Sequence, residues 1–594
     1  MPPWRLSGLF KREFPEHIRS SKGQGRTGRS VRNIFLAALL LSLPVSSAEP
    51  ALEYIFPIAW QTGSTNLVTL GGKFEPWPVQ VWTDCAGINF MAQTNSEKSS
   101  TNTGKFSVEI QANVPLGPHL LRVFNQDGAS LPRLFLITQQ KDEEEKEPND
   151  SFKQAQPVEK LPALITGRLE KGGDVDSFAL RLEGGKWLVA RLDAYSLGSP
   201  LDALLNLVNE QGLRVAFNHD SARNIDPLLA YHVEATGTYI LQVAGFAHPP
   251  EANVKFAGTP AAIYRLAITD GPLAHHIYPT GVQRGHKAQV QLFGWNLEQT
   301  AHTNEWFDAS NFTAETNMEW FSVPAIQGQF PVSISGATEQ IEIEPNNKTN
   351  QAQRISLPCS ITGRIDQAGD EDRFLFTAKK DDRWDFRVIS GALDLPLDAV
   401  LKIEDAAGKV LVEDDDGNGR PDAKLVWAAP SDGSYIAAVS DRFGNGGTDF
   451  VYRLAIAPSI PDFKVSIPDN VIRLEPGKTN EIKLTVTRFD GYTNALRVNI
   501  DGLSTEVTFQ AGEVPPQNGE VKVNFLAATN APPTNLPLRI LVQTTNTIPS
   551  DVRPAMFDLR GKDPRFEAII NETDHLWLTV VPKQQVPKPE EKKK

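Results

Sequence analysis

The chain has 594 residues, which is too many for one hydrophobic core and predicts three to six domains of roughly 100–200 residues each. Its 43 Gly and 43 Pro favour short strands joined by turns, and no long stretch shows helical periodicity, so we predict an all-β fold. A net charge of −13 argues against a nucleic-acid partner and suits divalent cations.

The N-terminus has the pattern of an export signal. A basic region over residues 1–32 precedes the apolar run Ile34–Leu43 and the small residues that end at Ala48. We expect a signal peptide over 1–48, and hence a secreted, periplasmic or cell-surface protein without a membrane span in the mature chain. The alternative is an uncleaved N-terminal anchor, although the apolar run is shorter than the helix of about 20 residues that is needed to span a membrane.

Cys85 and Cys359 are the two cysteines, and they fall in different predicted modules. Two cysteines provide no disulfide framework, and we expect no bond between them. We expect each one to be a small buried apolar residue.

The first mature module is predicted over residues 51–140, where apolar and polar residues alternate between Gly-, Pro- and Asn-rich turns. Such alternation is typical of strands that bury one face in a two-sheet sandwich. Its opening returns 222 positions later, in a shorter module over 273–340 that lacks the hairpin over 115–124. The matched residues of the first copy are Pro57, Gln61, Gly63, Leu70 and Gly72. Both segments resemble the immunoglobulin-like, TIG-type modules of secreted bacterial proteins.

A larger repeat occupies residues 141–270 and 341–458. From Asp174 to Tyr239, many residues recur at a constant offset of 196, and both copies contain Glu-Pro-Asn, Gly-Asp-x-Asp-x-Phe, Leu-Asp-Ala and Gly-x-Tyr. Apolar residues also match at alternate positions, which preserves the strand register because a slip of one residue would expose the core face. Each copy ends in Tyr-Arg-Leu.

These motifs resemble the bacterial pre-peptidase C-terminal domain. The resemblance implies an eight-stranded, jelly-roll-like β-sandwich of the kind found beside secreted peptidases and other exported enzymes. Related domains of clostridial collagenases bind collagen. A final immunoglobulin-like sandwich is predicted over 461–581 from its alternating strands, and residues 582–594 are too polar to bury and should be disordered. The whole is therefore predicted to be a multi-domain string of β-sandwiches.

The Glu-Pro-Asn segment is the best candidate for a metal site. Glu145, Glu147 and Asn149 alternate, so an extended strand would direct their side chains to one face. Ca²⁺ takes six to eight oxygen ligands, which carboxylates and amides supply. The alternative is that Pro and Asn shape a turn while the acidic side chains remain in water.

The family resemblance implies a calcium site made by this segment and the Asp-x-Asp turn. In the first repeat the implied ligands are Glu145, Glu147, Asn149, Asp150, Asp174 and Asp176. In the second they are Glu342, Glu344, Asn346, Asn347, Asp370 and Asp372. Asn347 stands where the first copy has an acid, which predicts a lower ligand charge and a weaker site.

No nucleophile elbow, zinc-protease motif, P-loop or Cys-x-x-Cys pair occurs in the sequence. We therefore expect a non-catalytic binding or adhesion protein, stabilised by calcium and contacting an extracellular polysaccharide, matrix or protein. The alternatives are an accessory subunit of a secreted hydrolase or peptidase, a hydrolase with an unrecognised site, and a passive extracellular spacer.

Overall fold

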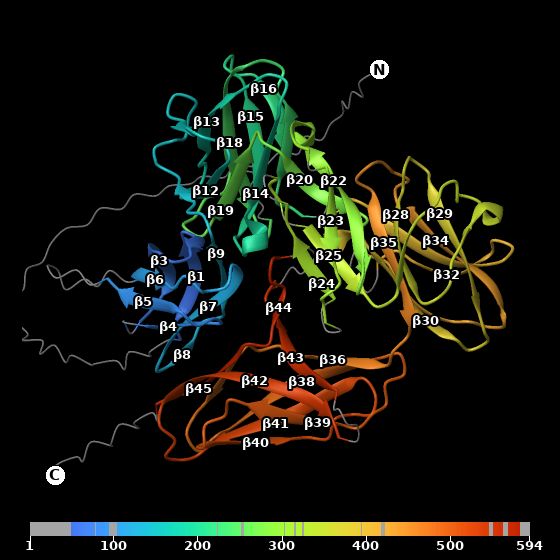
Figure 1. Ribbon diagram of the computed structural model, residues 1–594. Helices are drawn as coiled ribbons and strands as arrows, with labels where there is room; N and C mark the ends of the chain where they lie inside the picture. Colours follow the sequence, from blue (N-terminus) through green and yellow to red (C-terminus); the bar gives the residue numbers. More distant parts are fainter. Residues whose placement is uncertain are drawn as a thin grey trace, which may run out of the picture. The chain divides into compact units, whose positions relative to one another are not determined.

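The computed structural model describes residues 49–582, apart from gaps at 76, 78, 94–103, 222–223, 251–254, 302, 314–316, 324–325, 329, 394, 417–421, 546–550 and 562–567. The predicted signal peptide and nearly all of the predicted C-terminal tail lie outside these residues. Within them the only helices are short 3-10 turns and the remaining regular structure is strand, so the all-β prediction is confirmed (Figure 1). In this part of the chain, no helix has the length and apolarity that a membrane crossing needs.

Residues 51–138 form two sheets around one core. The sheet orders are β1-β3-β6-β5 and β2-β9-β7-β4, with β8 beside β7. Trp60 and Phe135 stack in the core at a centroid distance of 4.3 Å. The strands are β1 (Ala51–Phe56), β2 (Ala59–Gln61), β3 (Thr65–Lys73), β4 (Gln80–Thr83), β5 (Ile88–Ala92), β6 (Lys105–Ile110), β7 (Gly117–Asn125), β8 (Gly128–Ala129) and β9 (Arg133–Thr138).

Residues 273–335 form a smaller sandwich with sheet orders β20-β22-β23 and β21-β25-β24. The parallel pair β21–β25 corresponds to β2–β9, and β24 lies beside β25 as β7 lies beside β9. Because β24 takes the place of β7, the prediction that the hairpin over 115–124 is missing was wrong. Among the described residues, β4, β5 and β8 are the strands without counterparts. The elements are β20 (Leu273–Tyr278), β21 (Gly281–Gln283), β22 (Lys287–Trp295), η2 (Leu297–Gln299), β23 (Asn304–Asp308), β24 (Met318–Phe321) and β25 (Phe330–Ser335).

The first large repeat is a sandwich of two five-stranded sheets, ordered β10-β12-β19-β14-β17 and β11-β13-β18-β15-β16. β10 and β11 are short strands that extend an eight-stranded body. The elements are β10 (Glu143–Glu144), β11 (Gln156–Pro157), β12 (Ala163–Arg168), β13 (Asp176–Leu182), β14 (Trp187–Asp193), η1 (Tyr195–Leu197), β15 (Leu201–Val208), β16 (Arg214–Asn218), β17 (Leu228–His232), β18 (Gly237–Ala247) and β19 (Ile263–Thr269).

The second repeat has the same strand order, β26-β28-β35-β30-β33 and β27-β29-β34-β31-β32, so the repetition inferred from sequence extends to topology. Phe386 and Val388 are buried as their counterparts Ala190 and Leu192 are. The elements are β26 (Thr338–Ile341), η3 (Thr349–Gln351), β27 (Gln353–Arg354), β28 (Cys359–Arg364), β29 (Glu371–Ala378), β30 (Arg383–Ile389), η4 (Gly391–Leu393), β31 (Ala399–Asp405), β32 (Val410–Asp414), β33 (Lys424–Ala428), β34 (Gly433–Asp441) and β35 (Val451–Pro458).

The Tyr-Arg-Leu ending of each repeat has a structural explanation. In β19 successive side chains point to opposite faces, so Tyr264 and Leu266 enter the core while Arg265 faces the other way. Arg265 donates from Nε and Nη2 to the two oxygens of Asp142, at 2.6 and 3.0 Å. This pair fixes the segment that leads into the sandwich, and Arg453 pairs with Glu339 in the second repeat.

The C-terminal residues 462–580 form one connected set of strands around a single core. Its main order is β37-β45-β42-β43-β36-β38-β41-β40, with β39 beside β42 and β44 beside β43. The strands are β36 (Asp462–Ser466), β37 (Val471–Leu474), β38 (Thr479–Phe489), β39 (Leu496–Asp501), β40 (Val507–Ala511), β41 (Gly519–Ala527), β42 (Thr534–Thr544), β43 (Val552–Asp558), β44 (Glu572–Thr573) and β45 (Leu576–Val580).

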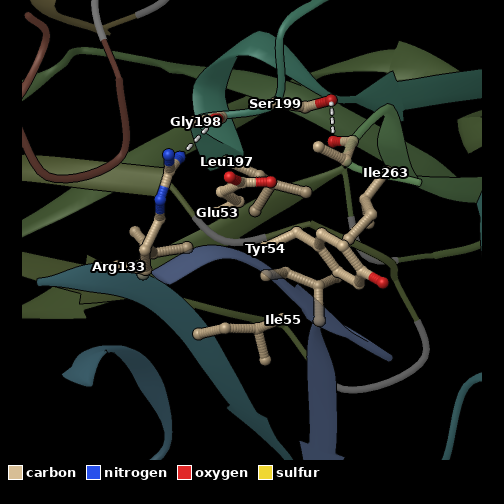
Figure 2. A pocket seen from close by; sticks show the side chains of 11 residues that line it. Glu53, Tyr54, Ile55, Arg133, Leu197, Gly198, Ser199 and Ile263 are labelled. Atoms are coloured by element: carbon tan, nitrogen blue, oxygen red, sulfur yellow. Dashed lines mark hydrogen bonds between the residues drawn. The ribbon is translucent and has the colours of Figure 1, made fainter. Parts of the chain in front are cut away.

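The residues that line a small cavity include Tyr54, Arg133, Gly198, Ser199 and Ala261. Figure 2 shows the side chains around it. Its volume of about 20 Å³ is enough for about one water molecule. Arg133 Nη1 donates to the carbonyl of Gly198 at 3.1 Å, and Ser199 Oγ donates to the carbonyl of Ala261 at 3.3 Å. These contacts make the cavity a packing feature and exclude it as a ligand site.

The aromatic core of the second repeat gives a stability prediction. Phe376 is 1% exposed, and its ring centroid lies 5.5 Å from that of Phe386 and 6.0 Å from those of Trp427 and Tyr435. Phe376→Ala should lower the free energy of unfolding of this repeat by about 3–5 kcal/mol, because it removes buried contacts and leaves a cavity. Chemical denaturation with hydrogen exchange of the β29 and β34 amides measures this loss. Phe443→Ala, at a side chain 72% exposed, should stay within about 0.5 kcal/mol.

Candidate metal sites

Three carboxylates of the first repeat converge, as its motif predicts. One oxygen from each of Glu147, Asp174 and Asp176 lies within 4.8 Å of the other two. Asp174 and Asp176 are fully buried, whereas Glu147 is exposed, so the group opens to solvent on one side. A buried charge needs a partner, and three ionised carboxylates this close together would create a strongly negative electrostatic potential.

Local backbone structure aims the two aspartates. Gly173 has a φ of +89°, which places a left-handed turn before Asp174, and Asp176 is the first residue of β13. Asp174 Oδ2 accepts a hydrogen bond from the Glu170 N–H at 2.6 Å. Asp174 Oδ1 and Asp176 Oδ1 are buried and accept no hydrogen bond from the protein. Each aspartate therefore has one oxygen held in place and one available to a ligand.

Asn149 is fully buried, and neither atom of its side-chain amide has a hydrogen-bond partner. Its backbone N–H donates to Glu147 Oε2 at 3.0 Å, and its carbonyl accepts from the Ser177 N–H at 3.1 Å. Through the bond from Ser177, Asn149 connects the Glu-Pro-Asn segment to β13. A buried, unpaired amide is costly and rare, which marks this position as one that a ligand would satisfy.

The two remaining predicted ligands of the first repeat lie differently. Glu145 lies beside Asp176, and its Oε2 accepts from the Arg168 N–H at 2.8 Å and from the Tyr264 hydroxyl at 3.4 Å. The structure thus places Glu145 in a buried carboxyl pair outside the three-carboxylate group. Asp150 is exposed, and its Oδ2 lies 3.7 Å from Lys171 Nζ.

Burial dominates the electrostatics of this group. It raises the pKa of Asp176 to about 10, and the nearby charge of Glu145 adds to the effect. Burial also raises the pKa values of Glu145 and Asp174. A cation among these oxygens would favour their charged forms and so act against this shift.

The second repeat reproduces the arrangement. Oxygens of Glu344, Asp370 and Asp372 lie within 4.8 Å of one another, and both amide atoms of the fully buried Asn346 are unpaired. Burial raises the pKa of Asp372 to about 7. Glu342 Oε1 accepts from the Arg364 N–H at 2.8 Å, as Glu145 accepts from the Arg168 N–H. Burial, together with the charge of Asp372, raises the pKa of Glu342 to about 10.

The two sites differ at their rims. Asn347, which stands in place of an acid, donates its amide N–H to Asp370 Oδ1. Lys171, whose Nζ lies 3.6 Å from Asp174 Oδ1, corresponds at the offset of 196 to the neutral Gln367. The second site therefore lacks one acid and one base relative to the first, and the formal charge of these positions is unchanged.

Sequence reasoning missed the tyrosine that completes each site. The Tyr264 hydroxyl donates to Asp176 Oδ2 at 2.5 Å, and the Tyr452 hydroxyl donates to Asp372 Oδ2 at 2.6 Å. Gly167, which is paired with Tyr264 across β12 and β19, makes room for the ring. The signal was present, because Ile-Thr-Gly-Arg recurs at the offset of 196 and Tyr-Arg-Leu ends both copies.

Three further groups of potential metal ligands occur among the described residues. Each contains His, and in each the candidate ligand atoms lie within 4.8 Å of one another. They are Asp84, Cys85 and His119; Asp202, His219 and Asp220; and His275, His276 and Asp449.

Comparisons with known proteins add little to this picture. No family model matches the chain, and no curated protein matches it. Among solved structures, the pre-peptidase C-terminal domain of a collagenase from Bacillus anthracis is 15% identical, with 19% of this chain and 99% of that chain covered and a TM-score of 0.16.

Two immunoglobulin-type structures each cover 86% of this chain and 99% of their own. The four N-terminal immunoglobulin domains of Dscam1 isoform 6.9 are 10% identical with a TM-score of 0.17, and the insect immune protein hemolin is 11% identical with a TM-score of 0.19. TM-scores this low carry no argument about function, so the site must be interpreted from its own geometry.

The close contact at Gly167 gives a prediction. A Cβ atom there would lie 2.3 Å from the Tyr264 hydroxyl oxygen and 2.6 Å from Glu145 Oε2. Gly167→Ala should therefore push the tyrosine away from Asp176 and lower the free energy of unfolding of the first repeat by about 1–3 kcal/mol. Denaturation with hydrogen exchange in β12 and β19 measures the effect. Gly237→Ala is the matched control, since its Cβ would meet nothing closer than 3.4 Å, and an equal loss there would contradict the explanation.

Proposed function

We propose that this chain is a secreted or cell-surface, non-catalytic binding or adhesion protein whose two large repeats are stabilised by calcium. The observation that carries the proposal is the repeated set of buried side-chain oxygens without a hydrogen bond, at Asn149, Asp174 and Asp176 and again at Asn346 and Asp372. Of these, Asp174 Oδ1 has only an ion pair with Lys171, at 3.6 Å. Two copies of a costly arrangement point to a shared ligand. Its partner would be an extracellular polysaccharide, a matrix component or another protein.

The residues present fit calcium. Glu147, Asn149, Asp174 and Asp176 offer only oxygen atoms, as do Glu344, Asn346, Asp370 and Asp372 in the second repeat. Hard cations prefer such ligands, and Ca²⁺ accepts the irregular geometry of mixed carboxylates, amides and water. Bound there, the ion would neutralise the carboxylates. Glu145 and Glu342 would then support the site through Asp176 and Asp372, and Asp150 and Asn347 would lie at its rim.

Calcium at this position would stabilise the entrance of each repeat. Asn149 lies before β11, Asp174 lies in the turn before β13, and Tyr264 lies on β19 at the end of the repeat. One ion would therefore connect segments that are more than 80 residues apart in sequence through Asp176 and its bond to Tyr264. Ordering the start of each sandwich is a structural role, and it requires no catalytic group.

A second observation favours binding to a glycan. A hollow of about 460 Å³, within the range of small-ligand sites, is lined by aromatic, amide and proline side chains. Aromatic rings pack against sugar rings, and amides exchange hydrogen bonds with hydroxyls. None of the lining residues is titratable, so the hollow suits recognition better than acid–base chemistry. The lining residues are Trp77, Gln80, Phe124, Asn125, Gln126, Pro533 and Asn535.

Calcium addition should raise the melting temperature of the full chain, because an ion bound only by the folded state stabilises it by about 2.7 kcal/mol at a hundred times its dissociation constant. Calorimetry with hydrogen exchange over 141–270 and 341–458 measures the effect in each repeat. Asp174→Asn should abolish it in the first repeat and Asp370→Asn in the second. Glu234→Gln, at an exposed residue of the first repeat outside the candidate ligand groups, serves as a control with the same charge change. An unchanged calcium response in the double variant would contradict the site.

Glycan and matrix arrays, run beside hydrolysis assays on peptides and glycans, separate the proposed binder from its alternatives. We expect binding without turnover, and Trp77→Ala should weaken glycan binding at least tenfold, whereas Trp306→Ala, at a side chain 64% exposed, should not. A blank array would favour a passive spacer. Turnover that one point mutation abolishes would instead establish a hydrolase.

A further inference from the structure

Asp84, Cys85 and His119 form a second kind of ligand group in the first sandwich. Asp84 and Cys85 follow directly after β4, and His119 lies on the neighbouring strand β7. A carboxylate oxygen, the thiol sulfur and a ring nitrogen lie within 4.8 Å of one another. Cys359 is fully buried in the core of the second repeat, as expected. Cys85 packs against the core of the first sandwich but is only half-buried, so the expectation holds for it in part.

The hydrogen bonds of His119 determine which nitrogen can bind an ion. Its Nε2 lies 2.9 Å from the carbonyl oxygen of Pro115, and a carbonyl only accepts, so Nε2 carries a proton. The other nitrogen, Nδ1, faces Asp84 Oδ1 at 3.1 Å. Such a backbone acceptor is the usual partner of a metal-binding histidine, because it fixes the tautomer and orients the ring.

The backbone holds the group in place. The Asp84 N–H donates to the carbonyl of Leu120 at 3.1 Å, and Thr83 Oγ1 donates to the carbonyl of Cys85 at 2.8 Å. The side chains of His119 and Asp84 are only 10% and 16% exposed. In a tetrahedral zinc site the ligand atoms lie about 3.3–3.7 Å apart, given metal–ligand bonds of about 2.0–2.3 Å, so the group needs little movement to close on an ion.

We propose that Asp84 Oδ1, Cys85 Sγ and His119 Nδ1 bind a divalent transition-metal ion, with Zn²⁺ as the best fit. Sulfur and nitrogen ligands select such an ion over calcium, which distinguishes this site from the all-oxygen groups of the repeats. Three protein ligands leave a fourth position for water. Among the described residues of the shorter sandwich no strand corresponds to β4, so the site is not repeated there.

The protonation of His119 and Cys85 depends on whether a metal ion is bound. Without a metal, the carboxylate of Asp84 raises the pKa of His119, while burial and Asp84 raise the pKa of the Cys85 thiol to about 11. The Cys85 thiol therefore keeps its proton at neutral pH. An entering Zn²⁺ would bind Sγ and Nδ1 and release to solvent the thiol proton and any proton on Nδ1.

Cobalt titration of the reduced, chelator-treated full chain tests the site, with calcium present in excess to fill the all-oxygen groups. We expect a thiolate-to-cobalt charge-transfer band with one ion bound, because thiolate ligands give this band and oxygen ligands do not. Cys85→Ser should abolish the band, and His119→Gln should weaken zinc binding at least tenfold. Cys359→Ser is the matched control and should keep the full band, since the chain has only these two cysteines.

A wild-type chain without the band, or a Cys85→Ser variant that retains it, would overturn the proposal.

Alkylation of the unmutated protein gives a test that does not depend on how a variant folds. Zinc should slow the reaction of Cys85 with iodoacetamide at least tenfold, and calcium should leave the rate unchanged. Equal rates with and without zinc would also overturn the site, whatever calcium does at the repeats.

Discussion

The hydrogen bond from Tyr264 to Asp176 connects the two sheets of the first repeat, since the tyrosine lies on β19 and the aspartate on β13. Both side chains are fully buried, so removing either partner would leave a polar group without water. A typical hydrogen bond contributes about 0.5–1.5 kcal/mol, whereas leaving one buried partner unsatisfied costs about 1–3 kcal/mol. Tyr452 and Asp372 repeat the connection in the second copy.

The position of the metal group depends on this connection. Asp176 has one oxygen committed to the tyrosine and the other unpaired, while Glu145 lies beside it and accepts from the same hydroxyl. The tyrosine ring can reach the carboxyl pair only because its neighbour across the strands is Gly167. One glycine, one tyrosine and two acidic residues thus place a group of polar side chains at the edge of an otherwise apolar core.

Much of the fold and part of the site could be predicted from the sequence. Alternation of apolar residues indicated strands, and the constant offset of 196 indicated that the two repeats share one strand order. The Glu-Pro-Asn and Asp-x-Asp motifs correctly named the three convergent carboxylates of each copy. Each motif is local in sequence, but it was the family resemblance that joined the Glu-Pro-Asn segment to the later Asp-x-Asp turn in one site.

The remainder depended on contacts that spacing cannot show. Tyr264 is 88 residues from Asp176, and only the pairing of β12 with β19 brings the tyrosine over Gly167. Glu145 was assigned to the metal group by alternation, but the Arg168 N–H holds its carboxylate beside Asp176 instead. Cys85 and His119 meet because β4 pairs with β7, and the spacing of the two residues in the sequence does not show this pairing.

The direction of β10 has a consequence for how such a chain can grow. β10 runs parallel to β12, while β19 runs antiparallel to β12 on its other side. The chain therefore enters and leaves the repeat towards the same end of this sheet, and β26, β28 and β35 do the same in the second copy. A unit whose two ends lie together can be inserted, deleted or exchanged with little disturbance to what flanks it. This geometry makes the repeat an easily duplicated unit, and this chain carries it twice.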